Sequence, residues 1–191
     1  QGASGGLLQM VNHGISTGAL FLLVGVLYER RHTRQIADFG GIAKVMPAYA
    51  TLFMITTLSS IGLPGTNGFI GEFLVLLGAF EKWRPLAVVA TSGVILAAAY
   101  MLWMFQRVFF GPVKHEANQG LRDLDGREWA YLLPLIAVIF WIGFYPQSFL
   151  KKMQPSVDRW LTTVRPAAVA QAAPTPDGEF VAPSGPAFTG R

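Results

Sequence analysis

The residue with the clearest capacity for chemistry in this sequence is Glu72, a single glutamate inside a long apolar segment. Its neighbours are Phe, Leu, Val and Ile, whereas nearly all other charged residues lie in short polar segments between the apolar runs. A carboxylate in an apolar medium is costly unless it is paired, hydrated or protonated, and such groups within membranes commonly serve ion or proton transfer. Glu72 is therefore the leading candidate for proton transfer.

The charge of Glu72 depends on two opposing effects, because a helix is expected to begin near Gly68, four residues earlier. A helix N-terminus stabilises an anion by about 0.3–1 kcal/mol, or ~2 kcal/mol when partly buried. Desolvation of a fully buried carboxyl disfavours the anion by roughly 4–7 kcal/mol. Desolvation should prevail unless a cation or water lies nearby, so the group can gain and lose a proton. The alternative is a neutral glutamic acid that only hydrogen-bonds the local turn.

A polar stripe runs along the first apolar segment at spacings of three and four residues, which places its members on one helix face: Gln9, His13, Ser16 and Thr17. Histidine titrates near neutral pH and can pass a proton between its ring nitrogens. We predict that His13 relays protons and that Ser16 and Thr17 line a water path; a structural histidine is the alternative. Gly14 and Gly18 have small-xxx-small spacing, which predicts close packing of another helix there.

Other kinds of functional site find no support in the sequence. The chain has no cysteine, which excludes disulfides and cysteine-ligated centres. A single histidine in the apolar segments cannot supply both axial ligands of a b-type haem, and no carboxylate cluster suggests a metal. No phosphate loop or dinucleotide motif is present, and no basic face interleaved with aromatics points to nucleic acid. We expect no cofactor, no metal and no nucleic-acid partner for this chain.

The elements that must hold these residues are transmembrane helices. Of the 191 residues, 52% are hydrophobic and 14% are charged, and the mean hydropathy is +0.41, values typical of an integral membrane protein. Four apolar segments can each cross ~30 Å of hydrocarbon: residues 5–28, 47–80, 85–110 and 129–150. The predicted fold is all-α, with these four spans in a transmembrane region over residues 1–165.

The second segment, residues 47–80, is too long for one straight crossing. As a continuous helix its 34 residues would measure ~50 Å, well beyond the bilayer core. Pro64 removes a backbone donor, and Gly65 and Gly68 allow conformations that a helix interior does not. We predict two half-helices broken at Leu63–Gly68, with the turn buried in protein or lining a wet cavity, since free backbone groups cannot face lipid.

The two ends of the chain carry less information. Residues 151–165 are expected to form a short amphipathic segment at the membrane surface. Residues 166–191 are mostly Ala, Pro and Gly and are predicted to be a flexible tail, because they cannot bury much apolar surface. The sequence opens with QGASGGLLQM, which has no initiator methionine, no basic n-region and no cleavage site. We therefore expect either a piece of a longer protein or the product of a split gene.

Several stretches closely resemble chain M (subunit 4), a family of antiporter-like subunits in proton-pumping NADH:quinone oxidoreductase, or respiratory complex I. The similarity covers roughly residues 2–160, and two stretches are specific when they occur together: NHGISTGALFLLVGVLYERRHTR and LPGTNGFIGEF. The resemblance implies that the chain is the C-terminal part of such a subunit. Its spans would be the last four of fourteen transmembrane helices, with residues 47–80 as the discontinuous helix.

The resemblance also implies roles and partners. Glu72 falls on the terminal proton-transfer residue, where sibling antiporter-like subunits carry lysine, and His13 falls on a channel histidine. Electron transfer would occur in other subunits. The partners would be sibling membrane-arm subunits, the upstream helices of the same subunit and lipid, in a bacterial plasma membrane or an organellar inner membrane. A subunit of an Mrp-type Na⁺/H⁺ antiporter or of an energy-converting hydrogenase membrane arm is an alternative, as is a purely structural anchor.

Overall fold

The computed structural model describes residues 1–172, and all regular structure within them is helical. This confirms the predicted all-α fold class for the described part of the chain. The long helices are α1 (Gly2–Arg31), α3 (Pro47–Ser60), α4 (Asn67–Lys82), α5 (Arg84–Phe109), α6 (Gly126–Phe144) and α7 (Gln147–Ala172). Three short elements lie in the loops: η1 (Ile36–Asp38), α2 (Ile42–Val45) and η2 (Glu116–Asn118).

Within residues 1–172, three helices are long and apolar enough to cross a membrane alone: α1, α5 and α6. The segment 47–80 is interrupted as predicted, because α3 ends at Ser60 and α4 begins at Asn67. The halves contain 14 and 16 residues, which correspond to ~21 Å and ~24 Å of helix. Neither half alone reaches across ~30 Å of hydrocarbon. A crossing in this region therefore requires both halves in series.

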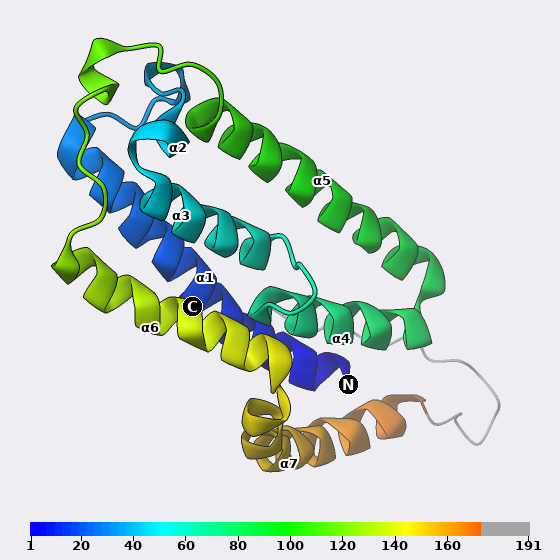
Figure 1. The fold of residues 1–191 in the computed structure, drawn as a ribbon. Helices are drawn as coiled ribbons and strands as arrows, with labels where there is room; N and C mark the ends of the chain where they lie inside the picture. The colour runs from blue at the N-terminus through cyan, green and yellow to red at the C-terminus, as the bar shows by residue number, and fades with distance from the viewer. Residues whose placement is uncertain (173–191) are drawn as a thin grey trace, which may run out of the picture. The chain divides into compact units, whose positions relative to one another are not determined.

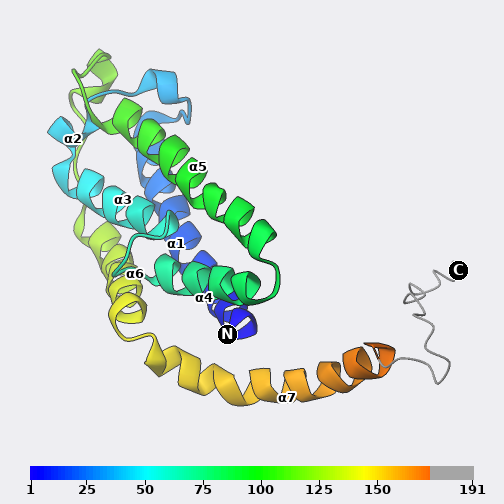
Figure 2. The ribbon, with the colours of Figure 1, turned by 90° about the vertical axis from the view of Figure 1, so that its right-hand side faces the viewer.

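Helix α1 is the central element of residues 1–152 and contacts α3, α4 and α6 (Figure 1). Both halves of the interrupted segment run antiparallel to it, α4 along its first half and α3 along its second. The two facing ends, Ser59 and Asn67, meet the middle of α1 at Ser16 and Asn12. Helix α5 contacts α4 near its own start and α2 and η1 near its end (Figure 2). The interruption thus lies where three helices converge.

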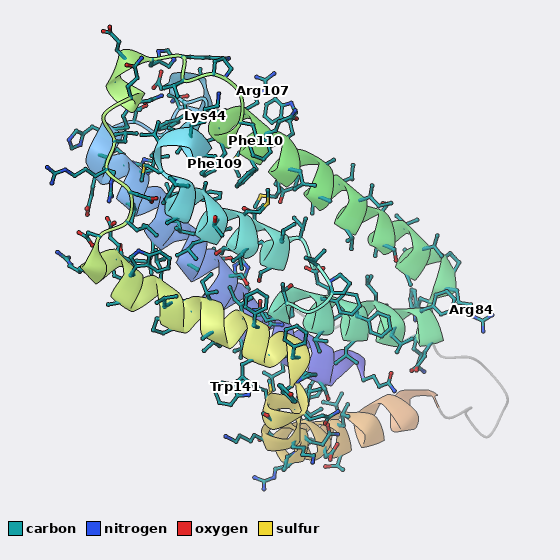
Figure 3. All side chains as sticks on the ribbon, in the orientation of Figure 1. Lys44, Arg84, Arg107, Phe109, Phe110 and Trp141 are labelled. Atoms are coloured by element: carbon teal, nitrogen blue, oxygen red, sulfur yellow. The ribbon has the colours of Figure 1, made fainter. Side chains whose placement is uncertain are left out.

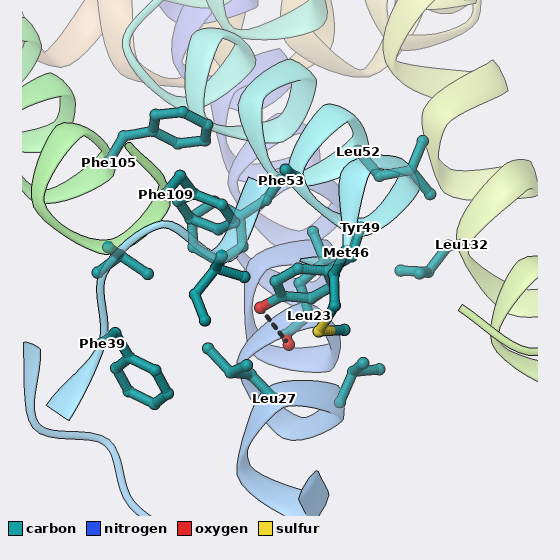
Figure 4. Close-up of a cluster of buried hydrophobic side chains, with 14 of the residues drawn as sticks. Leu23, Leu27, Phe39, Met46, Tyr49, Leu52, Phe53, Phe105, Phe109 and Leu132 are labelled. Carbon is teal, nitrogen blue, oxygen red and sulfur yellow. Dashed lines mark hydrogen bonds between the residues drawn. The ribbon is translucent and has the colours of Figure 1, made fainter. Parts of the chain in front are cut away.

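An aromatic cluster joins the start of α3 to the end of α5 (Figure 4). Tyr49 and Phe53 of α3 pack against Phe105 and Phe109 of α5, with ring centroids of Phe53 and Phe109 4.9 Å apart. The buried hydroxyl of Tyr49 donates to the backbone oxygen of Leu23 at 2.9 Å. A buried tyrosine hydroxyl needs such a partner. This contact fixes α3 against α1 at the end opposite to the interruption.

An ion pair joins the end of α1 to the start of α6. The guanidinium of Arg30 binds both carboxylate oxygens of Glu128, each at 2.7 Å, and the two side chains are 16% and 8% exposed. Glu128 also completes a capping box with Asp125 at the start of α6. Next to this pair, the carboxylate of Asp123 accepts from the first free backbone N–H groups of α3, including that of Tyr49 at 3.0 Å. Carboxylates therefore cap the starts of two helices, α6 and α3.

The structure places the last helix boundaries differently from the sequence-based ranges. The span expected at 129–150 is α6, which ends at Phe144, and Pro146 follows before α7 begins at Gln147. Proline cannot continue the helix hydrogen bonding of the preceding turn, which explains the early end. Helix α7 includes the segment 151–165, which was expected to be amphipathic, and continues through residues 166–172, where alanine favours helix. The rest of the predicted tail, residues 173–191, lies outside the described residues.

Candidate functional site

The link between α3 and α4 is a tight irregular turn. Thr66 donates to the backbone oxygen of Leu63 from both its N–H, at 3.1 Å, and its hydroxyl, at 2.6 Å. Gly62 and Gly65 have φ of +76° and +92°, a region that favours glycine. Pro64 lies within this turn, where its missing N–H removes no helical hydrogen bond. The turn therefore supplies hydrogen-bond partners for several of its own backbone groups.

Gly68 does not belong to this turn, contrary to the predicted range of the break. It is the second residue of α4, and a Cβ on it would lie 2.1 Å from the backbone oxygen of Ser59. Glycine is needed here for the close approach of the two half-helices rather than for an unusual backbone angle. A side chain at this position would push α4 away from the end of α3.

A buried polar cluster lies at the meeting point of α1, α3 and α4. The carbonyl oxygen of the Asn67 side chain accepts from Ser59 and, at 3.3 Å, from Ser16. The hydroxyl oxygens of Ser16 and Ser59 are 2.8 Å apart, and the amide of Asn12 donates to the backbone oxygen of Asn67 at 2.7 Å. All four residues are buried. Ser16, expected to line a water path, is thus part of the contact between the three helices.

Glu72 lies beside this cluster and is linked to it by Gln9. The amide of Gln9 donates to Glu72 Oε1 at 3.3 Å, and Gln9 Oε1 accepts from Asn12 at 3.3 Å. Glu72 is half-buried, and its other oxygen, Oε2, would be 2.5 Å from a Cβ on Gly62. The carboxyl therefore lies against the turn between the half-helices, one and a half helical turns into α4.

Two cavities flank Gln9. One, of about 260 Å³, is lined by Gln9, Glu72 and apolar residues of α4 and α5. The other, of about 240 Å³, is lined by Gln9, Asn12, His13, Ser16 and Thr17 together with the ends of the half-helices. Both volumes are large enough for several water molecules. Gln9 lines both cavities and contacts the carboxyl of Glu72 in the first.

The structure separates the predicted site residues into two groups. Glu72 and Ser16 join the network through Gln9 and Asn67, respectively. His13 is exposed in this chain, and its Nδ1 lies 3.1 Å from the hydroxyl of Thr17, so these two form their own pair on the second cavity. Gln9, which donates to Glu72, lines the same cavity as this pair.

None of the described residues supplies the close packing predicted at Gly14 and Gly18, since a Cβ on either would meet nothing within 4 Å. Close packing occurs instead where α1 crosses α4. A Cβ on Gly5 would lie 2.6 Å from Leu74 Cβ, and one on Gly71 would lie 2.2 Å from Gln9 Oε1. Small-residue spacing marks a helix face that permits close contact, but it does not identify which glycines face the neighbour.

Three members of the network, Asn12, Ser59 and Asn67, are absent from the residues selected on sequence. A signal was available for Asn12, because it stands three residues after Gln9 and four before Ser16 on the same helix face. Asn67 could be found as the residue that opens the second half-helix after a proline-glycine break. Ser59 lacks such a signal, because a single serine in an apolar helix is common and its partner is on another helix.

Comparison with known proteins gives a consistent set of relatives. A family model described as NADH:quinone oxidoreductase/Mrp antiporter, TM, matches residues 1–110. NADH-quinone oxidoreductase subunit M of Rhodobacter capsulatus is 50% identical over 157 residues, 82% of this chain and 31% of the relative. NADH-ubiquinone oxidoreductase chain 4 of Arabidopsis thaliana is 45% identical over 157 residues, 82% of this chain and 32% of the relative. The chain therefore spans about a third of the length of these relatives.

Solved structures agree with this result. A chain of respiratory complex I from Thermus thermophilus with bound NADH matches with a TM-score of 0.77 and 38% identity, over 83% of this chain and 33% of that chain. A chain of the Mrp complex from a Dietzia species matches with a TM-score of 0.68 and 21% identity, over 77% and 35%, which is a likeness of fold. Together with the apolar helices, these matches indicate an integral membrane protein. The chain belongs to the NADH:quinone oxidoreductase/Mrp antiporter transmembrane family.

Proposed function

We propose that the chain is the C-terminal part of an antiporter-like, proton-translocating subunit of NADH:quinone oxidoreductase, in which Glu72 gains and loses the transported proton. The observation that carries this proposal is the position of Glu72, a half-buried carboxyl that lies against a helix interruption and lines a cavity. Ionisable groups of this kind, at discontinuous helices, are the usual coupling sites of membrane transporters.

The surroundings of Glu72 support a hydrated route away from it. Gln9 contacts the carboxyl on one side and lines the second cavity on the other. Asn12 Oδ1 and Ser60 Oγ are buried without a hydrogen-bond partner among residues 1–172, and ordered water commonly satisfies such atoms. In this proposal, water in the second cavity connects Gln9 to the His13 and Thr17 pair. His13 then relays the proton, and Thr17 orients the ring.

The assignment to the whole protein follows from the relatives. We propose that α1, the α3 and α4 pair, α5 and α6 are the last four of fourteen transmembrane helices, because the matched relatives are about three times as long. The remaining helices, the sibling membrane-arm subunits and lipid would be its partners. Redox cofactors would lie in other subunits. An Mrp-type antiporter is the second candidate, since the family model and the fold include it.

Replacement of Glu72 by Gln tests the proposal in the intact assembly reconstituted in vesicles. Glu72→Gln keeps the shape of the side chain and the hydrogen bond from Gln9 while it removes the titratable proton. We expect NADH-driven proton uptake, measured with a pH-sensitive dye, to fall by about tenfold or more. Glu81→Gln is the matched control, because Glu81 is exposed at the far end of the same helix. This control should pump normally.

Two outcomes would contradict the proposal. Normal pumping by Glu72→Gln in a fully assembled complex would show that the carboxyl only anchors helices. Transport that follows a sodium gradient, without NADH oxidation, would favour the Mrp-type antiporter. Assembly is checked in each case by the amount of this chain that is recovered in the purified complex.

A further inference from the structure

A groove of about 960 Å³ lies where α5 ends, between the segment after α1 and the segment after α5. Three cationic residues line it, Arg34, Arg107 and Lys114, and its lining contains no Asp or Glu. All three are exposed. Figure 3 shows Arg107 and Phe110 together at this end of α5. The groove therefore has a strongly positive character that the proposed proton route does not use.

The walls of the groove are joined by specific contacts. The N–H of Gly41 donates to the backbone oxygen of Phe110 at 3.1 Å, and His115 Nε2 lies 3.2 Å from the backbone oxygen of Ala37. Each contact links the segment after α1 to the segment after α5. The shape of the groove is thus set by contacts between the two segments.

The cations are not neutralised by the described part of the chain. The ion pair within residues 1–172 joins Arg30 to Glu128 and involves none of the three. The guanidinium of Arg107 stacks on the ring of Trp103 at 4.2 Å, which holds it in place while its N–H edge stays available. An oriented guanidinium is well suited to bind phosphate oxygens.

The surface of α5 next to the groove is apolar and exposed in this chain. Trp103 is 50% exposed, and Ile95 and Leu96, two turns earlier on the same helix, are 70% and 66% exposed. Helix α5 is a candidate membrane span, and only 6% of the residues in its most apolar stretch are buried. Aromatic residues and cations at the end of a span mark the headgroup level of the bilayer. Cations suited to bind phosphate thus lie next to an apolar surface of a membrane span.

We propose that this groove binds the headgroup of an anionic phospholipid, with its phosphate at Arg107, Lys114 and Arg34 and its acyl chains along α5. A protein neighbour is less favoured, because the cationic groove continues into the apolar face of a membrane span, an arrangement that matches the two parts of one lipid molecule. The proposal does not depend on the proton-transfer role of Glu72.

The test uses the intact assembly that contains the full chain, in phosphatidylcholine vesicles with added phosphatidylglycerol that carries a photoreactive acyl chain. Adducts on residues 95–103 are counted by mass spectrometry while unlabelled phosphatidylglycerol competes. Each Lys or Arg near an anionic lipid contributes about fivefold in affinity. We expect Arg107→Gln with Lys114→Gln to lower the affinity about 25-fold, and Arg107→Lys to lower it much less.

The matched control is Arg122→Gln with Arg127→Gln, which removes the same charge from exposed residues that do not line the groove. It should leave labelling unchanged, and higher salt should weaken labelling of the wild-type protein. Equal labelling by photoreactive phosphatidylcholine, an equal loss in the control or insensitivity to salt would overturn the proposal. So would cross-links from Lys114 to another subunit together with an absence of lipid adducts.

Discussion

Gln9 and Glu72 are joined by a hydrogen bond of 3.3 Å between α1 and α4, and Gln9 is also the acceptor for Asn12. One neutral side chain thereby connects a titratable carboxyl to a buried polar cluster. An amide can donate and accept at once, so it can stay bonded whether Glu72 is protonated or charged. Gln9 is therefore suited to hold the carboxyl in one position through the cycle of proton transfer that we propose.

Gln9→Met tests this role, because methionine has a similar length but cannot replace both hydrogen bonds. A hydrogen bond contributes about 0.5–1.5 kcal/mol, so we expect proton pumping to fall about two- to tenfold, less than with Glu72→Gln. Pumping is compared with NADH oxidation in the same vesicles. Gln119→Met, at an exposed loop position, is the control. Equal pumping by both variants would remove Gln9 from the route.

Gly71→Ala tests the close contact between α1 and α4. The new Cβ would lie 2.2 Å from Gln9 Oε1 and 3.0 Å from Gln9 Cα, so the helices must separate. Overpacking of this kind costs about 1–3 kcal/mol. We expect a lower midpoint of thermal unfolding in the purified assembly. Gly6→Ala adds the same methyl group where nothing lies within 4 Å, and it should not lower the midpoint.

Arg30→Met tests the ion pair at the start of α6. The substitution leaves Glu128 buried without its cation and removes the donor to the backbone oxygens of Arg122 and Asp123. Loss of one partner from a buried pair costs about 3–5 kcal/mol. We expect poor assembly and a clearly lower thermal midpoint, whereas Arg127→Met, at an exposed position, should behave like the wild type. Equal behaviour of the two variants would contradict a structural role for the pair.

Asp123→Ala tests the carboxylate that caps α3. Its oxygens accept from the N–H groups of Ala48 and Tyr49 at 2.8 Å and 3.0 Å. Hydrogen bonds to charged groups contribute about 1.5–3 kcal/mol, and the helix dipole adds to this. We expect faster amide hydrogen exchange at residues 48–53 than in the wild type. Glu116→Ala, an exposed acid in the same loop, should leave this exchange unchanged.

The class of fold and the interruption of the second segment could be predicted because both are local properties. Hydropathy and segment length reveal membrane helices, and a proline with two glycines inside 34 apolar residues leaves few alternatives to a break. The extent of the break was less predictable. Gly68 looked like a turn residue, and its actual reason for being glycine is a contact with Ser59, which only the packing reveals.

Contacts between distant parts of the chain were not predictable in the same way. Arg30 and Glu128 are 98 positions apart, and each lies near a segment end where a loop charge is ordinary. Asn12 and Asn67 are 55 positions apart. A polar residue in an apolar run shows that some partner is needed, but it does not say which helix supplies it. The glutamate stood out because it was the single acid in its segment.

Helix α6 packs against the turn between the half-helices. A Cβ on Gly143 would lie 2.2 Å from the backbone oxygen of Gly65, so the two backbones are in direct contact. Closely packed surfaces transmit displacement rather than absorb it. A movement of the turn toward α6 would therefore require α6 to shift as well, which couples the position of α6 to the backbone beside Glu72.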